Sequence, residues 1–371
     1  MTTFRVPFVD LPRQYLGLRE QLLAAMDRVC KSGAYVLGED VARFEEEIAE
    51  YCGTRRALGV ANGSDALMLS MKALGIGPGD EVITAPNSFI ASAWTIAAVG
   101  AKPVFADVGD DYNIDPACVE AAITPRTRAI MPVHLTGRPA RMDELLAICR
   151  KHGLAMVEDA AQAIGARYKG RRTGSFGVAG CFSLHPLKNL HAYGDGGLIT
   201  TDDDVLWEKL LKLRNHGLRN RDECDSWGYN SRLDSIQAAV LRIKLPHLDA
   251  WNERCRDIAG RYRVALEKHI SVPHDRPEEE PIYHRFIVQV DERERLMEYL
   301  VEQGVETKVN YPIPIHLQPI GRQLGYEAGD FPVTERQARR IMSLPLYPEL
   351  RDEEIDFVID RVESFYRAGT S

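Results

Sequence analysis

The 371-residue sequence has no uninterrupted apolar run of about 18 residues, so nothing in it predicts a membrane-spanning helix. Its first residues, MTTFRVPFVDLPRQ, lack the apolar stretch of a signal peptide. The seven cysteines are scattered singly, without the CxxC spacing of a zinc or redox site, and their odd number argues against a disulfide framework. These absences make a reducing cytoplasm the simplest location for the chain.

Several enzyme signatures are missing as well. GDGG at 194–197 lacks the GxGxxG spacing of a dinucleotide-binding loop. No HExxH motif or zinc-ligand cluster is present, so we expect no metal site. GVANGS and GRRTGS do not fit the GxSxG motif of a Ser–His–Asp hydrolase. The net charge of −8 does not favour nucleic acid or an anionic membrane as a partner.

What the chain does contain is a series of short apolar runs that alternate with helical patterns. Seven runs predict strands, at 57–60, 82–85, 103–106, 129–133, 155–158, 181–184 and 198–201. Most are almost continuously apolar, as expected for strands buried on both faces. Helical patterns at 64–74, 91–99 and 141–153 lie between several of them, with Ser64 as N-cap of the first and Gly153 as C-cap of the third. We therefore predict an α/β fold with a mainly parallel seven-stranded sheet and helices on both faces.

Length and one proline indicate a second domain. A chain of 371 residues is long for a single domain, and Pro246 should kink or split the helical pattern of 233–269. We place the boundary there, with a large α/β domain over 1–247 and a small α+β domain over 248–371. The small domain is predicted from 282–290, 292–304, 306–311 and about 352–367, the second and last being helix candidates, while 273–281 resembles a solvated surface loop.

Two residues with complementary chemistry follow two of the predicted strands. Asp159 comes directly after the run at 155–158, and Lys188 comes shortly after the run at 181–184. An amine can form a Schiff base with the aldehyde of pyridoxal phosphate, and a carboxylate can keep its pyridine nitrogen protonated, which makes the ring an electron sink. Ligands of such sheets bind at the carboxyl ends of strands. The pair predicts an enzyme that moves or removes amino groups, although Lys188 could be a surface lysine and Asp159 the N-cap of a following helix.

The stretch NGSDAL, at 62–67, follows a strand and opens a helix. The exposed N–H groups and the positive end of such a helix attract anions, so Gly63 and Ser64 are candidates to hold a cofactor phosphate. The same pattern is often only a helix cap. Ser183, at the end of another predicted strand, could add a hydroxyl group.

Two further side chains could contact the cofactor ring. Phe89 lies just past a strand, where an aromatic ring can stack on a pyridine, although it could also be a core residue. Gln162 lies three residues after Asp159, on the same side of the expected helix, and could reach the ring oxygen or face solvent.

The segment EDAAQAIGARYKGRRTGSFGVAGCFSLHPLKNLHAYGDGG, at 158–197, resembles the DegT–StrS family of nucleotide-sugar aminotransferases. VANGSDAL, PNSFIAS, PVHLTG, GYNSRLDSIQAAVL and YPIPIHLQP share the resemblance, which covers nearly the whole chain. It implies a fold type I homodimer that uses pyridoxal 5'-phosphate (PLP), with active sites at the dimer interface. It further implies transfer of an amino group from L-glutamate (or glutamine) to a keto group of a dTDP- or UDP-linked deoxysugar.

The resemblance also assigns roles to residues. Lys188 looks like the Schiff-base lysine, Asp159 like the pyridine partner, and Gln162 and Phe89 like ring contacts; Gly63, Ser64, Asp65 (through its backbone) and Ser183 look like phosphate ligands, Asn230 like a phosphate ligand of the partner subunit, and His185, Tyr311 and His316 like residues of the sugar site. Basic residues such as Arg214, Arg219 and Arg232 could bind the diphosphate.

Two motifs indicate which sugar carbon is aminated. GSDAL and AYGDGG are more similar to family members that aminate C3 than to those that act at C4. A 4-keto sugar aminotransferase, a PLP-dependent dehydratase or lyase, and a non-catalytic regulatory member of the family stay open as alternatives. Relatives that dehydrate carry histidine in place of the lysine, so Lys188 favours transamination.

Overall fold

The computed structural model describes residues 4–369. Its centre is a seven-stranded sheet in the order β1-β9-β8-β5-β4-β2-β3. The strands are β1 (Arg56–Val60), β2 (Glu81–Thr84), β3 (Lys102–Phe105), β4 (Thr127–Met131), β5 (Ala155–Asp159), β8 (Ala179–Ser183) and β9 (Gly197–Thr201). All seven predicted runs form strands here, and the mainly parallel sheet is confirmed. The sequence did not predict that β9 runs antiparallel to both of its neighbours, β1 and β8.

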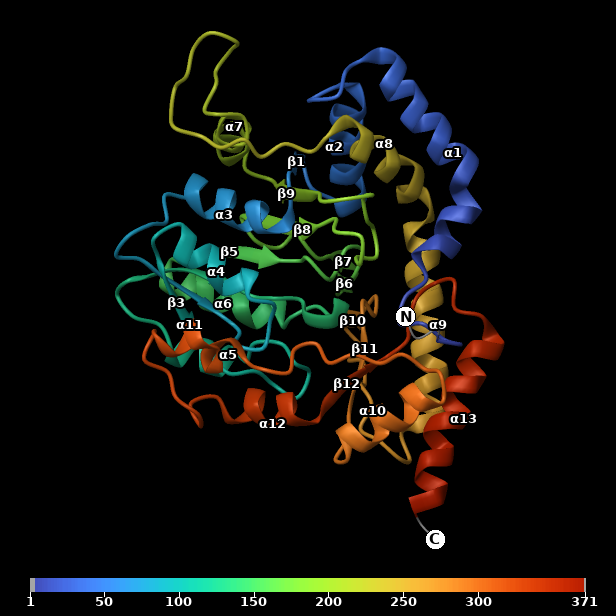
Figure 1. Ribbon diagram of the computed structural model, residues 1–371. Coiled ribbons are helices and arrows are strands. Elements are labelled where there is room, and N and C mark those ends of the chain that lie inside the picture. The colour runs from blue at the N-terminus through green and yellow to red at the C-terminus, as the bar shows by residue number, and fades with distance from the viewer. Residues whose placement is uncertain (1–3, 370–371) are drawn as a thin grey trace.

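Helices cover both faces of this sheet (Figure 1). The helices of the first two thirds are α1 (Leu11–Ser32), α2 (Glu39–Cys52), α3 (Gly63–Ala73), α4 (Ala91–Ala98), α5 (Pro116–Ala121), η1 (Leu135–Gly137), α6 (Met142–His152) and α7 (Asp204–Leu213). Adjacent residues of β8 show why: Cys181 packs into an apolar cluster with α3 and α7, whereas Phe182 packs with α2 on the other face. Side chains of a strand alternate between faces, so a strand covered on both sides must be apolar throughout.

The head of α3 is capped differently from the prediction. The N-cap is Asn62, whose Oδ1 accepts a hydrogen bond of 2.8 Å from the backbone N–H of Asp65, so Ser64 lies inside the helix. Asn62 can do this because its backbone is extended and its side chain folds back over the first turn. The C-cap of α6 is confirmed, since Gly153 has a left-handed φ of 65°.

No helix follows Asp159. Residues 160–166 form two tight turns, in which Ala163 N–H donates to Ala160 O and Ala166 N–H donates to Ala163 O. The alternative interpretation of Asp159 as a helix cap is therefore wrong. The idea that Gln162 shares a helical face with Asp159 is wrong for the same reason.

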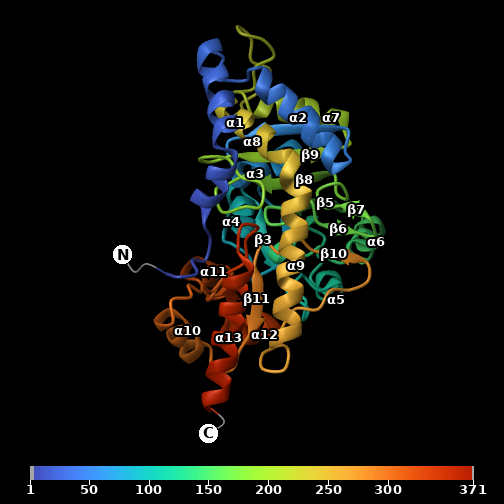
Figure 2. The same ribbon diagram turned by 90° about the vertical axis from the view of Figure 1, so that its right-hand side faces the viewer.

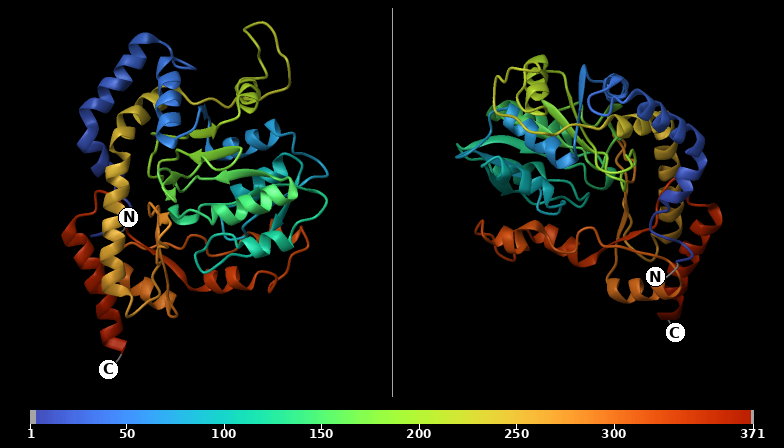
Figure 3. Two further views of the ribbon diagram at one scale, coloured as in Figure 1. Left: turned by 180° about the vertical axis from the view of Figure 1, so that it is seen from behind. Right: turned by 45° about the horizontal axis from the view of Figure 1, so that its top comes forward.

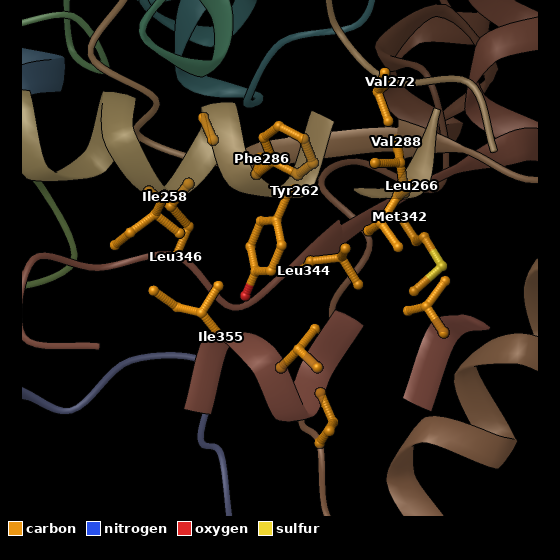
Figure 4. Packing of buried hydrophobic residues seen from close by; sticks show 14 of the residues in the cluster. Ile258, Tyr262, Leu266, Val272, Phe286, Val288, Met342, Leu344, Leu346 and Ile355 are labelled. Atoms are coloured by element: carbon orange, nitrogen blue, oxygen red, sulfur yellow. The ribbon is translucent and has the colours of Figure 1, made fainter. Parts of the chain in front are cut away.

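Pro246 divides the long helical stretch, as predicted. The chain passes from α8 (Ser235–Lys244) through η2 (Leu245–His247) into α9 (Leu248–Leu266). The remaining elements are β10 (Glu279–Glu280), β11 (Phe286–Gln289), α10 (Arg293–Glu302), η3 (Ile315–Leu317), α11 (Pro319–Arg322), α12 (Pro332–Arg340), β12 (Ile341–Leu344) and α13 (Asp352–Gly369). Helices α9 and α13 lie side by side next to the β11–β12 pair (Figure 2). A separate apolar core fills this part, around Tyr262, Phe286, Leu344 and Ile355 (Figure 4).

The segment 273–281 is more than a solvated loop. Its β10 pairs with β6 (Arg167–Tyr168), which also pairs with β7 (Arg171–Arg172). Glu279 is buried there, because its carboxylate accepts a hydrogen bond of 2.6 Å from the guanidinium of Arg138. Near the amino terminus, Val6 forms a bridge to Val305 of the C-terminal part. The division into 1–247 and 248–371 stays a prediction. Within residues 4–369, the structure contains no helix with the length and apolar character needed to span a membrane.

Candidate active site

A cavity of about 460 Å³ opens at the carboxyl ends of β5 and β8, beside the head of α3. Lys188 and Asp159 both line it. The two strands are parallel neighbours in which Asp159 pairs with Cys181, and Lys188 lies five residues beyond the end of β8. The structure thus brings the two residues that were 29 positions apart to the wall of one cavity.

Asp159 is held in the cavity wall by hydroxyl and amide donors. It is 4% exposed, and its Oδ2 accepts a hydrogen bond of 2.7 Å from Ser92 Oγ while Oδ1 accepts one of 3.2 Å from Ala161 N–H. Ser88 Oγ lies 2.8 Å from Ser92 Oγ. A carboxylate can only accept, so Ser92 donates its single hydroxyl proton to Asp159, and Ser88 must be the donor to Ser92. Burial raises the pKa of Asp159, and the hydrogen bond from Ser92 opposes this rise.

Lys188 lies in the irregular segment between β8 and β9. Its backbone is fixed on both sides, since Lys188 N–H donates to His185 O and Lys188 O lies 3.0 Å from His191 Nδ1. Desolvation by the surrounding protein and, to a smaller extent, repulsion from Arg285 lower the pKa of Lys188 to about 8, while Asp159 opposes this shift. About a tenth of this amine is therefore neutral at pH 7, far more than for an ordinary lysine, and the neutral form is the one that attacks a carbonyl group.

The head of α3 forms another part of the cavity wall, against the end of β8. Gly63, Ser64 and Ser183 line the cavity, as predicted for an anion site. A Cβ on Gly63 would lie 2.8 Å from Ser183 Cβ, so glycine allows the helix head to approach the end of β8. Asp65 is the exception among the predicted phosphate ligands: it does not line the cavity, and its N–H is already bonded to the cap Asn62.

Four of the other predicted contacts also reach the cavity. Phe89 and Tyr311 face each other, with ring centroids 5.8 Å apart, and Phe89 is 52% exposed. Gln162 is fixed by Thr136, whose N–H donates a 2.9 Å hydrogen bond to Gln162 Oε1. His185 lines the cavity from an exposed position.

Two predicted residues lie elsewhere. His316 is fully buried beneath Phe331, and its Nε2 lies 3.1 Å from Glu335 Oε1, so in this structure it packs the protein interior and does not line the cavity. Asn230 is exposed in the connection between α7 and α8 and does not line the cavity of its own chain.

The arginines suggested for the diphosphate have other partners. Arg214 is buried and bonds Glu45 and, at 2.9 Å, Gly59 O. Arg219 pairs with Glu223, and Arg232 donates a 2.9 Å hydrogen bond to Asn215. None of the three lines the cavity. The suggestion that these arginines bind the diphosphate is therefore wrong for the cavity of their own chain.

Sequence reasoning missed several lining residues. Ser88 and Ser92 carry a signal that could have been used, because both lie at the strand-to-helix junction after β2, where ligands of such sheets bind. His284, Arg285 and Asn310 carry none, since they come to the cavity from a segment that follows α9.

The residues of this cavity fit PLP. Lys188 offers an amine of lowered pKa, Asp159 a buried carboxylate for the pyridine nitrogen, and Gly63 and Ser64 the unpaired N–H groups of a helix head for the phosphate. A mainly parallel seven-stranded sheet with this cavity at its strand ends defines the protein class: a fold type I PLP-dependent transferase.

Comparison with known proteins narrows the class. The sequence profile of the DegT/DnrJ/EryC1/StrS aminotransferase family matches residues 17–363, and the chain belongs to this family. It is therefore a PLP-dependent aminotransferase. A solved structure with 31% identity and a TM-score of 0.91, ntda from Bacillus subtilis, contains the bound cofactor PMP; it covers 98% of this chain and 85% of the other.

Other relatives are similar along their whole length. The dTDP-3-amino-3,4,6-trideoxy-alpha-D-glucose transaminase of Streptomyces venezuelae is 46% identical over 98% of this chain and 97% of its own. A UDP-N-acetyl-3-dehydro-alpha-D-glucosamine 3-aminotransferase of Acidithiobacillus ferrooxidans is 44% identical over 94% and 95%. A Geobacillus stearothermophilus protein described as a pleiotropic regulatory protein is 44% identical over 98% and 99%. The crystal structure of S. venezuelae DesV in complex with a ketimine intermediate superimposes with a TM-score of 0.96, at 46% identity, covering 98% of this chain and 99% of the other.

Proposed function

We propose that this enzyme transfers an amino group from L-glutamate to the 3-keto group of a dTDP- or UDP-linked deoxysugar, in amino-sugar biosynthesis. The single observation that carries the proposal is the placement of Lys188 and Asp159 on one cavity wall, next to a helix head suited to phosphate. The substrate class is supported by the names of the relatives from S. venezuelae and A. ferrooxidans, which act on 3-amino or 3-dehydro nucleotide sugars.

Each residue has a defined task in this reaction. When bound, PLP supplies an electron sink that stabilises negative charge on the carbon bearing the amino group. Lys188 would hold the cofactor through Nζ, and its amine would move a proton at the carbon bearing the amino group. Asp159 holds a proton on the pyridine nitrogen, and Ser92 steadies its carboxylate. Phe89 and Gln162 orient the ring from the cavity walls.

We also propose a homodimer in which Asn230 contacts the phosphate in the partner's site. The connection between α7 and α8 projects from the body of the chain (Figure 3). Trp227 in it is 98% exposed, and Asn230 is exposed as well. A loop with these properties, outside its own cavity, is suited to reach a second subunit.

A subunit-mixing experiment tests this arrangement. Lys188→Ala and Asn230→Ala should each inactivate or weaken the enzyme. Mixed dimers refolded or exchanged from the two variants should regain activity, since one of their two sites then combines a native lysine with a native asparagine. Activity that never rises above that of the separate variants, in a preparation shown to contain mixed dimers, would argue against the shared site.

The substrate is tested by supplying nucleotide-linked 3-keto and 4-keto sugars with L-glutamate and detecting the amino product by mass. We expect the amino product from a 3-keto sugar. Amino product from a 4-keto sugar alone would show that the enzyme acts at C4. Loss of water without amino transfer would indicate a dehydratase. No turnover with any sugar would favour a regulatory role. All seven cysteines are free, which supports the reducing cytoplasm as the proposed location.

A further inference from the structure

One half-buried cation on the cavity wall has no carboxylate partner among the described residues. Arg285 immediately precedes β11, is half-buried and lines the cavity together with Lys188. Its Nη1 donates a 2.9 Å hydrogen bond to His284 O, and its guanidinium lies 5.0 Å from the ring centre of Phe8. None of the ion pairs formed within residues 4–369 includes it. Most of its five N–H donors are therefore directed at no protein acceptor.

Other buried arginines of this chain are paired. Arg138 bonds Glu279 and Asp275, and Arg214 bonds Glu45. Burying a charge without a partner is unfavourable, so buried arginines normally form ion pairs with carboxylates. Arg285 departs from this pattern on a cavity wall, where a ligand can supply the missing negative charge.

We propose that Arg285 binds a carboxylate of the amino donor. This inference rests on the proposed function, because it assumes an amino acid as donor. Arg285 and Lys188 line the same cavity, so a carboxylate bound to Arg285 lies in the space where the amino donor meets the amine. In an amino acid the carboxylate is attached directly to that carbon. In a nucleotide-linked sugar the diphosphate is separated from a 3-keto carbon by part of the sugar ring, and therefore fits this position less well.

Occupation of Arg285 would also affect the catalytic amine. The positive charge of Arg285 lowers the pKa of Lys188, after the larger effect of burial. A carboxylate bound to Arg285 cancels part of that repulsion, so the pKa of Lys188 rises when the donor is present. The neutral fraction of Lys188 is then larger while it captures the cofactor, and the amine is a stronger base when the donor is bound.

The test follows the donor half-reaction alone. PLP-loaded enzyme is mixed with L-glutamate without sugar, and the band near ~410 nm converts to one near ~330 nm as the amino group reaches the cofactor. We expect Arg285→Gln to raise the glutamate concentration that gives half the maximal rate by at least about tenfold, and Arg285→Lys to raise it less because the charge is kept. Arg150→Gln, the same change at an exposed arginine of α6, should leave it unaltered.

Two other donors identify the carboxylate. L-Alanine has only the α-carboxylate and 4-aminobutyrate only the distal one, so a loss shared by glutamate and alanine assigns Arg285 to the α-carboxylate. The inference is overturned if both Arg285→Gln and Arg285→Lys reach half the maximal rate at a glutamate concentration within about twofold of that of the unaltered enzyme. The proposed function would still stand.

If the unaltered enzyme does not react with glutamate, glutamate is excluded as the amino donor. Calorimetric binding of 2-oxoglutarate to the PLP-loaded enzyme then decides the inference. An affinity that Arg285→Gln leaves unchanged, or no binding at all, overturns it, while a loss of at least about tenfold supports it. PLP content and thermal unfolding of each variant distinguish a lost contact from a lost fold.

Discussion

Replacing Ser92 by alanine should destabilise the folded enzyme in a way that depends on pH. The substitution removes the 2.7 Å hydrogen bond to Asp159 Oδ2, and Ser88 loses its acceptor at the same time. A hydrogen bond to a charged group contributes about 1.5–3 kcal/mol, against about 0.5–1.5 kcal/mol for a neutral pair. Divided by about 1.4 kcal/mol per pKa unit, the difference predicts that the pKa of Asp159 rises by a further unit or so.

The direction in which stability changes with pH follows from proton linkage. Burial already raises the folded-state pKa of Asp159 above its ordinary value of 3.8. The folded protein therefore binds this proton more tightly than the unfolded chain, and the contribution of Asp159 to stability falls as pH rises from that value through the folded-state pKa. Without Ser92 the fall extends to higher pH. The loss of stability caused by Ser92→Ala should be small near pH 4 and larger near pH 9.

The assay is urea unfolding of the cofactor-free protein across this pH range. Ser70→Ala is a matched control, because Ser70 is also buried in a helix but donates to a neutral carbonyl, Ala66 O, at 2.8 Å. Ser70→Ala should lower the free energy of unfolding by about 1 kcal/mol at every pH. An effect of Ser92→Ala that is equally independent of pH would refute the reasoning that Ser92 stabilises the charged form of Asp159.

Three further outcomes are expected. Lys188→Ala should lower turnover by about 10³-fold or more and abolish borohydride-fixed cofactor in peptide mass spectra, whereas Lys151→Ala, at an exposed lysine, should do neither. The rate at which the cofactor-free enzyme captures PLP should rise through about pH 8, since the amine must be neutral; an inflection near the ordinary value of 10.5 would contradict the lowered pKa. Gly63→Ala, whose Cβ would lie 2.8 Å from Ser183 Cβ, should weaken PLP binding about tenfold in a fluorescence titration, while Gly260→Ala, with no atom within 4 Å of its Cβ, should not.

The site was only partly accessible to sequence reasoning. Lys188 and Asp159 could be placed together because each follows a strand, and the carboxyl ends of parallel strands share one edge of a sheet. Asp65 was misplaced because the competing cap, Asn62, looks like any other residue of a strand–helix junction until its side-chain direction is known. His316 was misplaced because burial under Phe331 depends on α12, whose packing no local pattern reveals.

By itself the sequence determined the layered α/β fold, the seven strands and the break at Pro246, because these follow from local rules: apolar runs for strands buried on both faces, and a missing N–H at proline. It also indicated that Lys188 and Asp159 belong to one site, and both line the same cavity. Only the tertiary structure decided that β9 runs against its neighbours, that two serines support Asp159, and that Arg285 stands unpaired in the cavity. These depend on contacts between residues far apart in the chain, and their free energies come from mutual packing and charge, which no single segment encodes.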